Sequence, residues 1–195
     1  RVLSHLSGAE TEIFDRVEGE PSLALVAEGV EVFRKAQPDT VLALGGGSAL
    51  DCAKGIVSMS GAKARLVAIP TTSGTGSEVT SFAILTHDHV KHPLVDSRMR
   101  PDMAILDSDL LTALPPGLIA ETGFDVLTHA AESFVAKNAG AITDLYAREA
   151  FSVAFANLPA SFAGDAGVRG EIHQAATMAG IAFDNAGLGV CHALS

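Results

Sequence analysis

The sequence is poor in cysteine and has no tryptophan. Its 195 residues include two cysteines, one tyrosine and nine phenylalanines. Two cysteines cannot form a disulfide framework, which excludes a small disulfide-stabilised secreted module. Both Cys52 and Cys191 have apolar neighbours, so we expect both side chains to be buried. This cysteine usage favours a reducing compartment, the cytoplasm.

Long hydrophobic runs are also missing. No apolar stretch reaches the roughly 18–20 residues that a membrane-spanning helix needs. Residues 1–20 are too polar for the hydrophobic region of a signal peptide. We therefore expect no membrane association.

Positive charge is scarce. Lysine and arginine number 13 against 23 acidic residues, which gives a formal net charge of −10. This charge disfavours nucleic acid as a partner and leaves room only for a local positive site, such as a phosphate cradle. The chain also lacks the GxSxG pattern of a nucleophile elbow, so nucleophilic hydrolysis is disfavoured.

What remains is enough apolar material for a sizeable core, since 48% of residues are hydrophobic and the mean hydropathy is +0.31. In the first half of the chain, an expected helix over residues 21–37 is followed by short apolar runs typical of strands. In the second half, the apolar residues recur at helical spacing. We expect strands at 40–44, 65–69, 79–86, 92–95 and 102–106, and helices at 117–135, 143–158, 171–183 and beyond Gly187. The sequence therefore predicts an α/β domain over residues 1–108 and an all-helical domain over residues 109–195.

Both ends of the chain suggest a fragment. The first residue is Arg1 instead of methionine, and Ser195 directly follows an apolar, helix-like segment. We expect the natural protein to continue at both ends.

Three consecutive glycines interrupt an apolar run at residues 41–54. Gly45, Gly46 and Gly47 separate an expected strand from an expected helix that Ser48 would cap. The N-terminus of a helix after such a turn attracts a diphosphate. The segment matches neither GxGxxG nor the P-loop, so a tight turn without a ligand is the alternative.

Asp125 and His129 lie four residues apart in the expected helix 117–135. This spacing places both side chains on one face, where a carboxylate and an imidazole suit Fe(II) or Zn(II). Thr122, Phe124 and Ala130 would form dry surroundings. The alternative is a weak charged pair on the helix surface.

Other histidines add a third ligand and a rival site. His192 follows a glycine-rich approach and is a natural third ligand, with a hydrogen-bonded core histidine as the alternative. The group His87, His89 and His92 is a weaker metal candidate, because it lies in a polar connection where histidines are commonly solvated.

A hydroxyl-rich loop over residues 71–78 offers a further binding element. Its hydroxyls and N–H groups would bind phosphate and ribose oxygens, or the loop is merely a polar turn. Lys91 would donate to a ribose hydroxyl or is an ordinary solvated lysine.

Five segments in order resemble the iron-dependent (group III) alcohol dehydrogenase family over nearly the whole chain. They are GGGSALDCAKG, AIPTTSGTGSEVTSFAIL, RPDMAILDSDLL, LPPGLIAETGFDVLTHAAES and NAGLGVCHALS. The resemblance implies a Rossmann-like dinucleotide-binding domain followed by an all-helical metal-binding domain, in a dehydroquinate synthase-like fold. The active site would lie in the cleft between them.

The resemblance also implies roles for individual residues. We expect a pyrophosphate turn, further cofactor contacts, a ribose contact and three of the family's four metal ligands. The fourth ligand would be a histidine beyond Ser195. The pyrophosphate turn would comprise Gly45, Gly46, Gly47, Ser48 and Asp51; the cofactor contacts Thr71, Thr72 and Thr80; the ribose contact Lys91; and the metal ligands Asp125, His129 and His192. The cofactors would be Fe(II), with Zn(II) as an alternative, and NAD or NADP.

The implied reaction is hydride transfer between NAD(P) and a short primary alcohol or aldehyde, in a homodimer or higher homo-oligomer. A short connection over residues 54–68 resembles the branch of 1-propanol dehydrogenases from bacterial microcompartments. Glycerol dehydrogenases and dehydroquinate synthases share the fold and are the enzymatic alternatives. An inactive, truncated nucleotide-binding remnant is the alternative outside enzymology.

Overall fold

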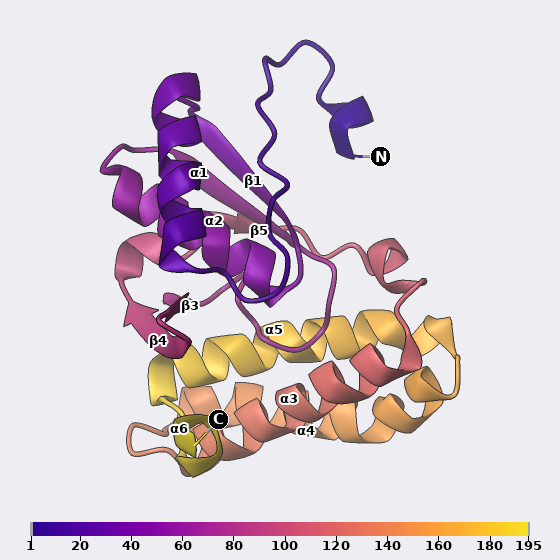
Figure 1. Ribbon diagram of the computed structural model, residues 1–195. Helices are drawn as coiled ribbons and strands as arrows, with labels where there is room; N and C mark the ends of the chain where they lie inside the picture. The colour runs from indigo at the N-terminus through magenta and orange to yellow at the C-terminus, as the bar shows by residue number, and fades with distance from the viewer. Residues whose placement is uncertain (1, 195) are drawn as a thin grey trace.

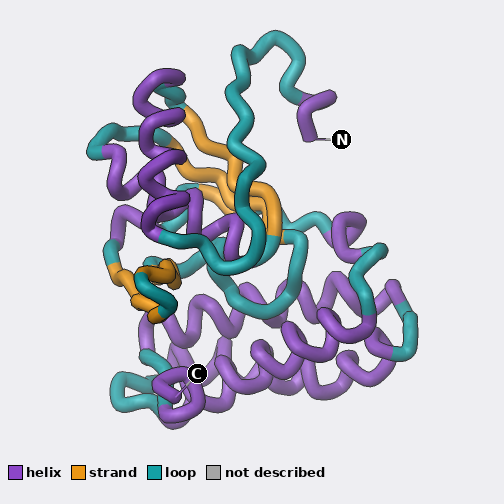
Figure 2. The backbone as a smooth tube through the Cα atoms, viewed as in Figure 1, coloured by secondary structure: helices purple, strands orange, loops and turns teal. Residues whose placement is uncertain are grey.

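The protein has two parts, one built around a sheet and one built from helices alone (Figure 1). The structure is a computed structural model that describes residues 2–194. Figure 2 shows that the strands are confined to the first part. This arrangement confirms the predicted fold class, an α/β part followed by a helical part. The predicted domain limits, 1–108 and 109–195, stay a prediction.

The first part contains a parallel sheet with strand order β1-β2-β5. Strand β1 (Thr40–Gly45) pairs with β2 (Arg65–Pro70), and α2 (Gly47–Ser60) is the crossover between them. Gly45 lies opposite Pro70 in this register. The glycine turn after β1 and the loop after β2 therefore leave the same edge of the sheet, as ligand-binding loops do in such folds.

Helix α1 (Leu23–Ala36) packs beside α2 on this sheet. Its Ser22 N-cap hydroxyl accepts a hydrogen bond from Leu25 N–H at 3.1 Å. Val26 and Phe33 lie on the buried face of α1, as its helical spacing predicts. They join side chains of α2 and the sheet in the main core, which includes Leu50, Ile56, Leu66 and Leu85.

The later strands differ in detail from the sequence prediction. β3 (Phe82–His87) and β4 (Val90–Val95) form an antiparallel hairpin whose turn residues, Asp88 and His89, have positive φ angles of 48° and 62°. The expected strand 79–86 begins only at Phe82, because the preceding residues form a turn. β5 (Met103–Ala104) has two residues, since its pairing with β2 is limited to Val67 and Ala68.

The second part packs α3 (Pro116–Val135), α4 (Ala141–Phe162) and α5 (Arg169–Ala186) side by side (Figure 1). The short α6 (Val190–Leu194) lies against the end of α3. Between residues 2 and 194, four short 3₁₀ helices complete the element order: Val2–His5, Ser97–Met99, Ser108–Leu111 and Ala166–Val168.

Small residues fill the core between these helices, which lets their backbones approach closely. The core contains Val126, Ala130, Ala150, Ala154, Ala175, Ala176 and Ala179. None of the helices between residues 2 and 194 is both long and apolar enough to cross a membrane.

Candidate metal centre and cofactor turn

The glycine turn is a close contact between the sheet edge and the loop of residues 71–81, the connecting loop. Gly45 has φ +150°, and a Cβ on Gly47 would lie 2.6 Å from Thr75 Cγ2. The N–H of Thr71 donates to the Gly45 carbonyl at 2.9 Å. α2 begins at Gly47, so the predicted capping role of Ser48 is wrong: Gly46 is the N-cap residue, and Ser48 lies inside the first turn.

Thr71 and Thr72 open the connecting loop directly beside this turn. A Cβ on Gly46 would lie 3.2 Å from Thr72 Oγ1. The structure therefore brings these two threonines together with the glycines, as the sequence predicts. Their contact with a cofactor stays a prediction.

Asp51 and Thr80 make hydrogen bonds within the protein. The Asp51 carboxylate accepts from Ser77 Oγ at 2.6 Å and from Ile84 N–H at 2.8 Å. Thr80 is 1% exposed, and its hydroxyl accepts from Lys54 Nζ at 3.0 Å. These bonds hold the connecting loop and β3 against α2, and the Asp51 side chain remains 13% exposed. The contacts of Asp51 and Thr80 with a cofactor stay a prediction.

Lys54 is a buried residue that the sequence analysis missed. It is fully buried on α2, and its Nζ also donates to the Phe82 carbonyl at 2.7 Å. Burial lowers the pKa of Lys54 to about 8, although the nearby carboxylates, Asp51 first, counteract this shift. The available signal was a lysine on the apolar face of a helix, three residues after Asp51.

The hairpin of β3 and β4 carries Lys91 and the histidines that the sequence suggested as a ribose contact and a rival metal site. Lys91 is half-exposed on β4 and pairs with Glu20, Nζ to Oε1 2.8 Å, so its approach to a ribose stays a prediction. His87 and His92 are neighbours with ring centroids 6.4 Å apart. Among the described residues, however, the hairpin histidines do not form a cluster of three convergent metal-ligating groups.

Asp125, His129 and His192 do converge. One ligand atom from each residue lies within 4.8 Å of the others. His129 Nε2 is 3.7 Å and His192 Nε2 is 3.5 Å from the same Asp125 oxygen, Oδ1. α3 supplies the first two residues one turn apart, and α6 brings in the third.

The surroundings orient both imidazole rings. The His129 and His192 rings stack with centroids 4.4 Å apart, and Phe183 of α5 stacks on the other side of His129. Glu132 Oε2 lies 2.6 Å from His192 Nδ1. His192 Nε2 is thereby directed at Asp125, the arrangement in which a partner holds a metal-ligating histidine by its second nitrogen. The stacked rings on either side hold His129.

Charge differs across the cluster. Burial lowers the pKa of His129, which favours its neutral, ligating form. Hydrogen bonding to Asp125 raises the pKa of His192. Burial alone would raise the pKa of Glu132, but hydrogen bonds from His192, Gly189 and Cys191 lower it to about 2.

These donors fit a transition metal. One carboxylate oxygen and two imidazole nitrogens suit Fe(II) or Zn(II). Two ligands about 2.1 Å from one ion in a tetrahedron are roughly 3.4 Å apart. The 3.5 and 3.7 Å separations at Asp125 are close to that value.

The predicted dry surroundings need one correction. Phe124 is 64% exposed, because it lies on α3 about a quarter turn away from the face that carries Asp125. Phe183, distant in sequence, supplies the apolar cover over His129. Cys191 is also exposed, because the short α6 leaves it at the surface, so its predicted burial is wrong while that of Cys52 is confirmed.

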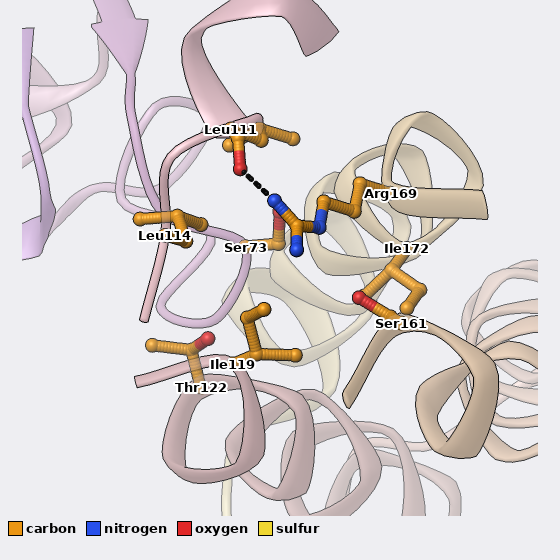
Figure 3. A pocket seen from close by; sticks show the side chains of 8 residues that line it. All are labelled: Ser73, Leu111, Leu114, Ile119, Thr122, Ser161, Arg169 and Ile172. Atoms are coloured by element: carbon orange, nitrogen blue, oxygen red, sulfur yellow. Dashed lines mark hydrogen bonds between the residues drawn. The ribbon is translucent and has the colours of Figure 1, made fainter. Parts of the chain in front are cut away.

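A small cavity lies between the connecting loop and the helices (Figure 3). Arg169 lines it and donates through Nη1 to the carbonyls of Leu111 and Thr112, both at 2.7 Å. Ser73 and Thr122 line it as well. None of the three candidate ligands lines this cavity, which belongs to the packing between the two parts.

The connecting loop is fixed along one face of α5. Ser73 Oγ lies 2.9 Å from His173 Nδ1, and the Thr177 hydroxyl donates to Glu78 Oε1 at 2.6 Å. Farther along, Ser81 donates to Asp184 Oδ1 through its N–H and its hydroxyl, at 2.8 and 2.7 Å. Figure 1 shows this loop descending from the sheet onto α5. These bonds fix the α/β part, which carries the glycine turn, against the helical part, which carries the Asp-His-His cluster.

The fold and the site together define a class of protein. It combines a parallel α/β unit of the dinucleotide-binding type, with a glycine turn, and a helical part with an Asp-His-His cluster suited to a metal ion. The chain belongs to the iron-containing alcohol dehydrogenase family. The family model for "Iron-containing alcohol dehydrogenase" matches residues 1–108, and the model for "Fe-containing alcohol dehydrogenase family, C-terminal" matches residues 119–195. This confirms the resemblance found in the sequence.

Curated relatives carry alcohol dehydrogenase names. The 1-propanol dehydrogenase PduQ of Citrobacter freundii is 44% identical over 191 residues, covering 94% of this chain and 52% of that protein. The NADPH-dependent butanol dehydrogenase of Clostridium saccharobutylicum is 38% identical, covering 100% of this chain and 56% of that protein. The chain thus spans about half the length of these relatives.

Solved structures share the fold. An iron-containing alcohol dehydrogenase from Thermococcus thioreducens superimposes with a TM-score of 0.92 at 36% identity, covering 97% of this chain and 56% of that one. A sulfoacetaldehyde reductase from Bifidobacterium kashiwanohense, solved in complex with NAD+, gives 0.91 at 32% identity and covers 98% of this chain and 57% of that one.

Proposed function

We propose that this chain carries the cofactor turn and three metal ligands of an NAD(P)-dependent alcohol dehydrogenase. The reaction is hydride transfer between the nicotinamide and a short primary alcohol or its aldehyde. The convergence of Asp125, His129 and His192 carries the proposal. The names of the propanol and butanol dehydrogenase relatives support the substrate class.

Each part of the site has a task in this reaction. When bound, Fe(II) or Zn(II) supplies a Lewis acid that lowers the pKa of an alcohol hydroxyl. Asp125 contributes the negative charge among the ligands, and the neutral His129 and Phe183 keep that side of the site dry. The glycine turn and the N-terminus of α2 bind the diphosphate of NAD or NADP. Thr71 and Thr72 donate to neighbouring oxygens.

The direct test is oxidation of NADH or NADPH that depends on propanal, after anaerobic loading with Fe(II). The 1-propanol dehydrogenase of Citrobacter freundii serves as the positive control. Turnover that disappears on chelation supports the proposal. Metal and NADH binding with turnover only on glycerol, or on no short aldehyde, favours the glycerol dehydrogenase-like or dehydroquinate synthase-like alternative. Failure to bind a metal favours the inactive nucleotide-binding remnant.

Substitution of a ligand separates the two halves of the site. Asp125→Ala or His129→Ala is expected to lower turnover by at least about 100-fold, because a lost ligand weakens metal binding. NADH affinity, measured by fluorescence titration, is expected to change by less than about 2-fold. Glu121→Ala, at an exposed position of the same helix, is the control. Loss of NADH binding together with turnover would contradict this division.

We also propose a cytoplasmic homodimer or higher homo-oligomer, with an association with bacterial microcompartments. The cysteine usage supports the compartment, and the similarity to a 1-propanol dehydrogenase supports the microcompartment association. Light scattering during size exclusion measures the oligomer, and a monomer at micromolar concentration would contradict it.

A further inference from the structure

Glu132 contacts the candidate ligand His192 without belonging to the ligand set. It lies on α3, three residues after His129, and is 8% exposed. Both carboxylate oxygens are engaged by the segment that carries His192. Oε2 accepts from Gly189 N–H at 3.0 Å and lies 2.6 Å from His192 Nδ1, and Oε1 accepts from Cys191 N–H at 2.6 Å.

The backbone of this segment is shaped for the contact. A Cβ on Gly189 would lie 2.8 Å from Glu132 Oε1, closer than two such atoms can approach. Glycine therefore permits a carboxylate to receive two backbone N–H groups and an imidazole at once. A tight contact of this kind fixes both the position of α6 and the rotation of the His192 ring.

Hydrogen-bond chemistry then decides the ring's tautomer. Both backbone partners are donors, so the carboxylate acts as the acceptor for the whole segment. His192 Nδ1 therefore carries a proton toward Glu132. In the neutral ring, the lone pair is left on Nε2, which is 3.5 Å from Asp125 Oδ1.

We propose that Glu132 is a positioning residue that holds His192 in the Nδ1–H tautomer and presents its Nε2 to a metal ion. This inference rests on the proposed metal centre. Glu132 makes no bond to the metal, and it acts entirely through His192 and the backbone of residues 189 and 191.

Glu132→Gln tests the inference with almost no change in shape. A side-chain amide has one oxygen acceptor and one NH2 donor, so it places a donor against at least one of the three groups that Glu132 accepts. Where the NH2 takes the place of Oε2, it faces His192 Nδ1, and the ring accepts its hydrogen bond by moving the proton to Nε2, which blocks the ligand atom. Where it takes the place of Oε1, it faces Cys191 N–H and weakens the bond that holds α6. Glu121→Gln, at an exposed position of the same helix, is the matched control.

Two measurements are made on the 195-residue chain. Zn²⁺ titration calorimetry is expected to show an affinity about 10- to 100-fold lower in Glu132→Gln than in the unsubstituted chain or the control, the usual effect of losing such a partner. In the metal-free protein, ¹⁵N NMR of the histidine rings is expected to show the His192 proton on Nδ1, and a larger fraction of the Nε2–H tautomer in the variant. A purely structural role would not move this proton.

The outcomes separate the two proposals. Equal Zn²⁺ affinities and an unchanged His192 tautomer, with only a lower melting temperature, would overturn the role of Glu132. An unsubstituted chain that does not bind Zn²⁺ would contradict the metal centre, whereas the NMR comparison would still decide the role of Glu132. If Glu132→Gln does not fold, Gly189→Ala displaces the same carboxylate without changing its charge and is expected to weaken Zn²⁺ binding in the same direction.

Discussion

At the scale of single residues, the two cysteines have opposite environments. Cys52 is buried, and burial, followed by the nearby charge of Asp51, raises the pKa of its thiol to about 11. Cys191 is exposed. A thiolate-selective reagent at pH 8 is therefore expected to modify one thiol per native chain and two after denaturation, measured by absorbance and by peptide mass.

Single substitutions identify the reactive thiol. Cys191→Ser is expected to abolish the rapid reaction of the native protein, and Cys52→Ser to leave its rate unchanged. Rapid modification of Cys52 in the native Cys191→Ser variant would show that the α1–α2 core is open to solvent on that timescale.

Residue identities in the site were predictable to different degrees. Asp125 and His129 could be paired from sequence because four residues make one helical turn. Glu132 and Phe183 were not found, because each meets its partner only through tertiary packing: Glu132 contacts residue 192, and Phe183 contacts residue 129. Local patterns contain no information on such distant pairs.

At the scale of elements, the contact between the connecting loop and α5 depends on glycine. A Cβ on Gly180 would lie 2.9 Å from the Gly76 carbonyl oxygen and 2.9 Å from Val79 Cγ2. Gly180→Ala is therefore expected to lower the free energy of unfolding by about 1–3 kcal/mol through overpacking, as measured by urea denaturation.

The control for this prediction is another helical glycine. Gly117 lies in the first turn of α3, and a Cβ there would meet nothing within 4 Å. Gly117→Ala is expected to leave stability unchanged or to raise it by up to about 1 kcal/mol, because alanine favours helix. Equal destabilisation by the two substitutions would contradict the close contact at Gly180.

The long helices were predicted well, and the short strands less well. α3 and α5 have periodic apolar faces that continue over many turns, so the sequence pattern alone locates them. β5 exists because Met103 and Ala104 pair with β2, and the Asp102 carboxylate accepts from Leu66 N–H at 2.8 Å. A strand of two residues is set by its partner, which its own sequence does not specify.

At the scale of the whole molecule, buried charges connect the two parts. Asp184 of α5 receives Ser81 and pairs with Arg100, and its side chain is 2% exposed. Glu78, 3% exposed, receives Thr177 of the same helix. The sequence predicted the two parts but not how they are joined. In the structure, the polar loop between β2 and β3 forms the buried contact between the two parts. Because a buried charge is stable only with its partners, the parts are expected to unfold together.

Because of Lys54, the free energy of unfolding is expected to depend on pH in the alkaline range. Its pKa is about 8 in the folded protein and 10.5 in a model peptide. Between these values the unfolded chain holds a proton on Lys54 that the folded chain has lost, so the free energy of unfolding rises with pH in this window. Relative to Lys54→Met, the unsubstituted chain is therefore expected to gain stability between pH 8 and about 10, measured by urea denaturation at several pH values.

Lys35→Met, at an exposed position of α1, is the control and is expected to show no such trend. A constant difference between the unsubstituted chain and Lys54→Met across this range would mean that Lys54 stays protonated in its buried site, held by Asp51, Glu78 and Asp184.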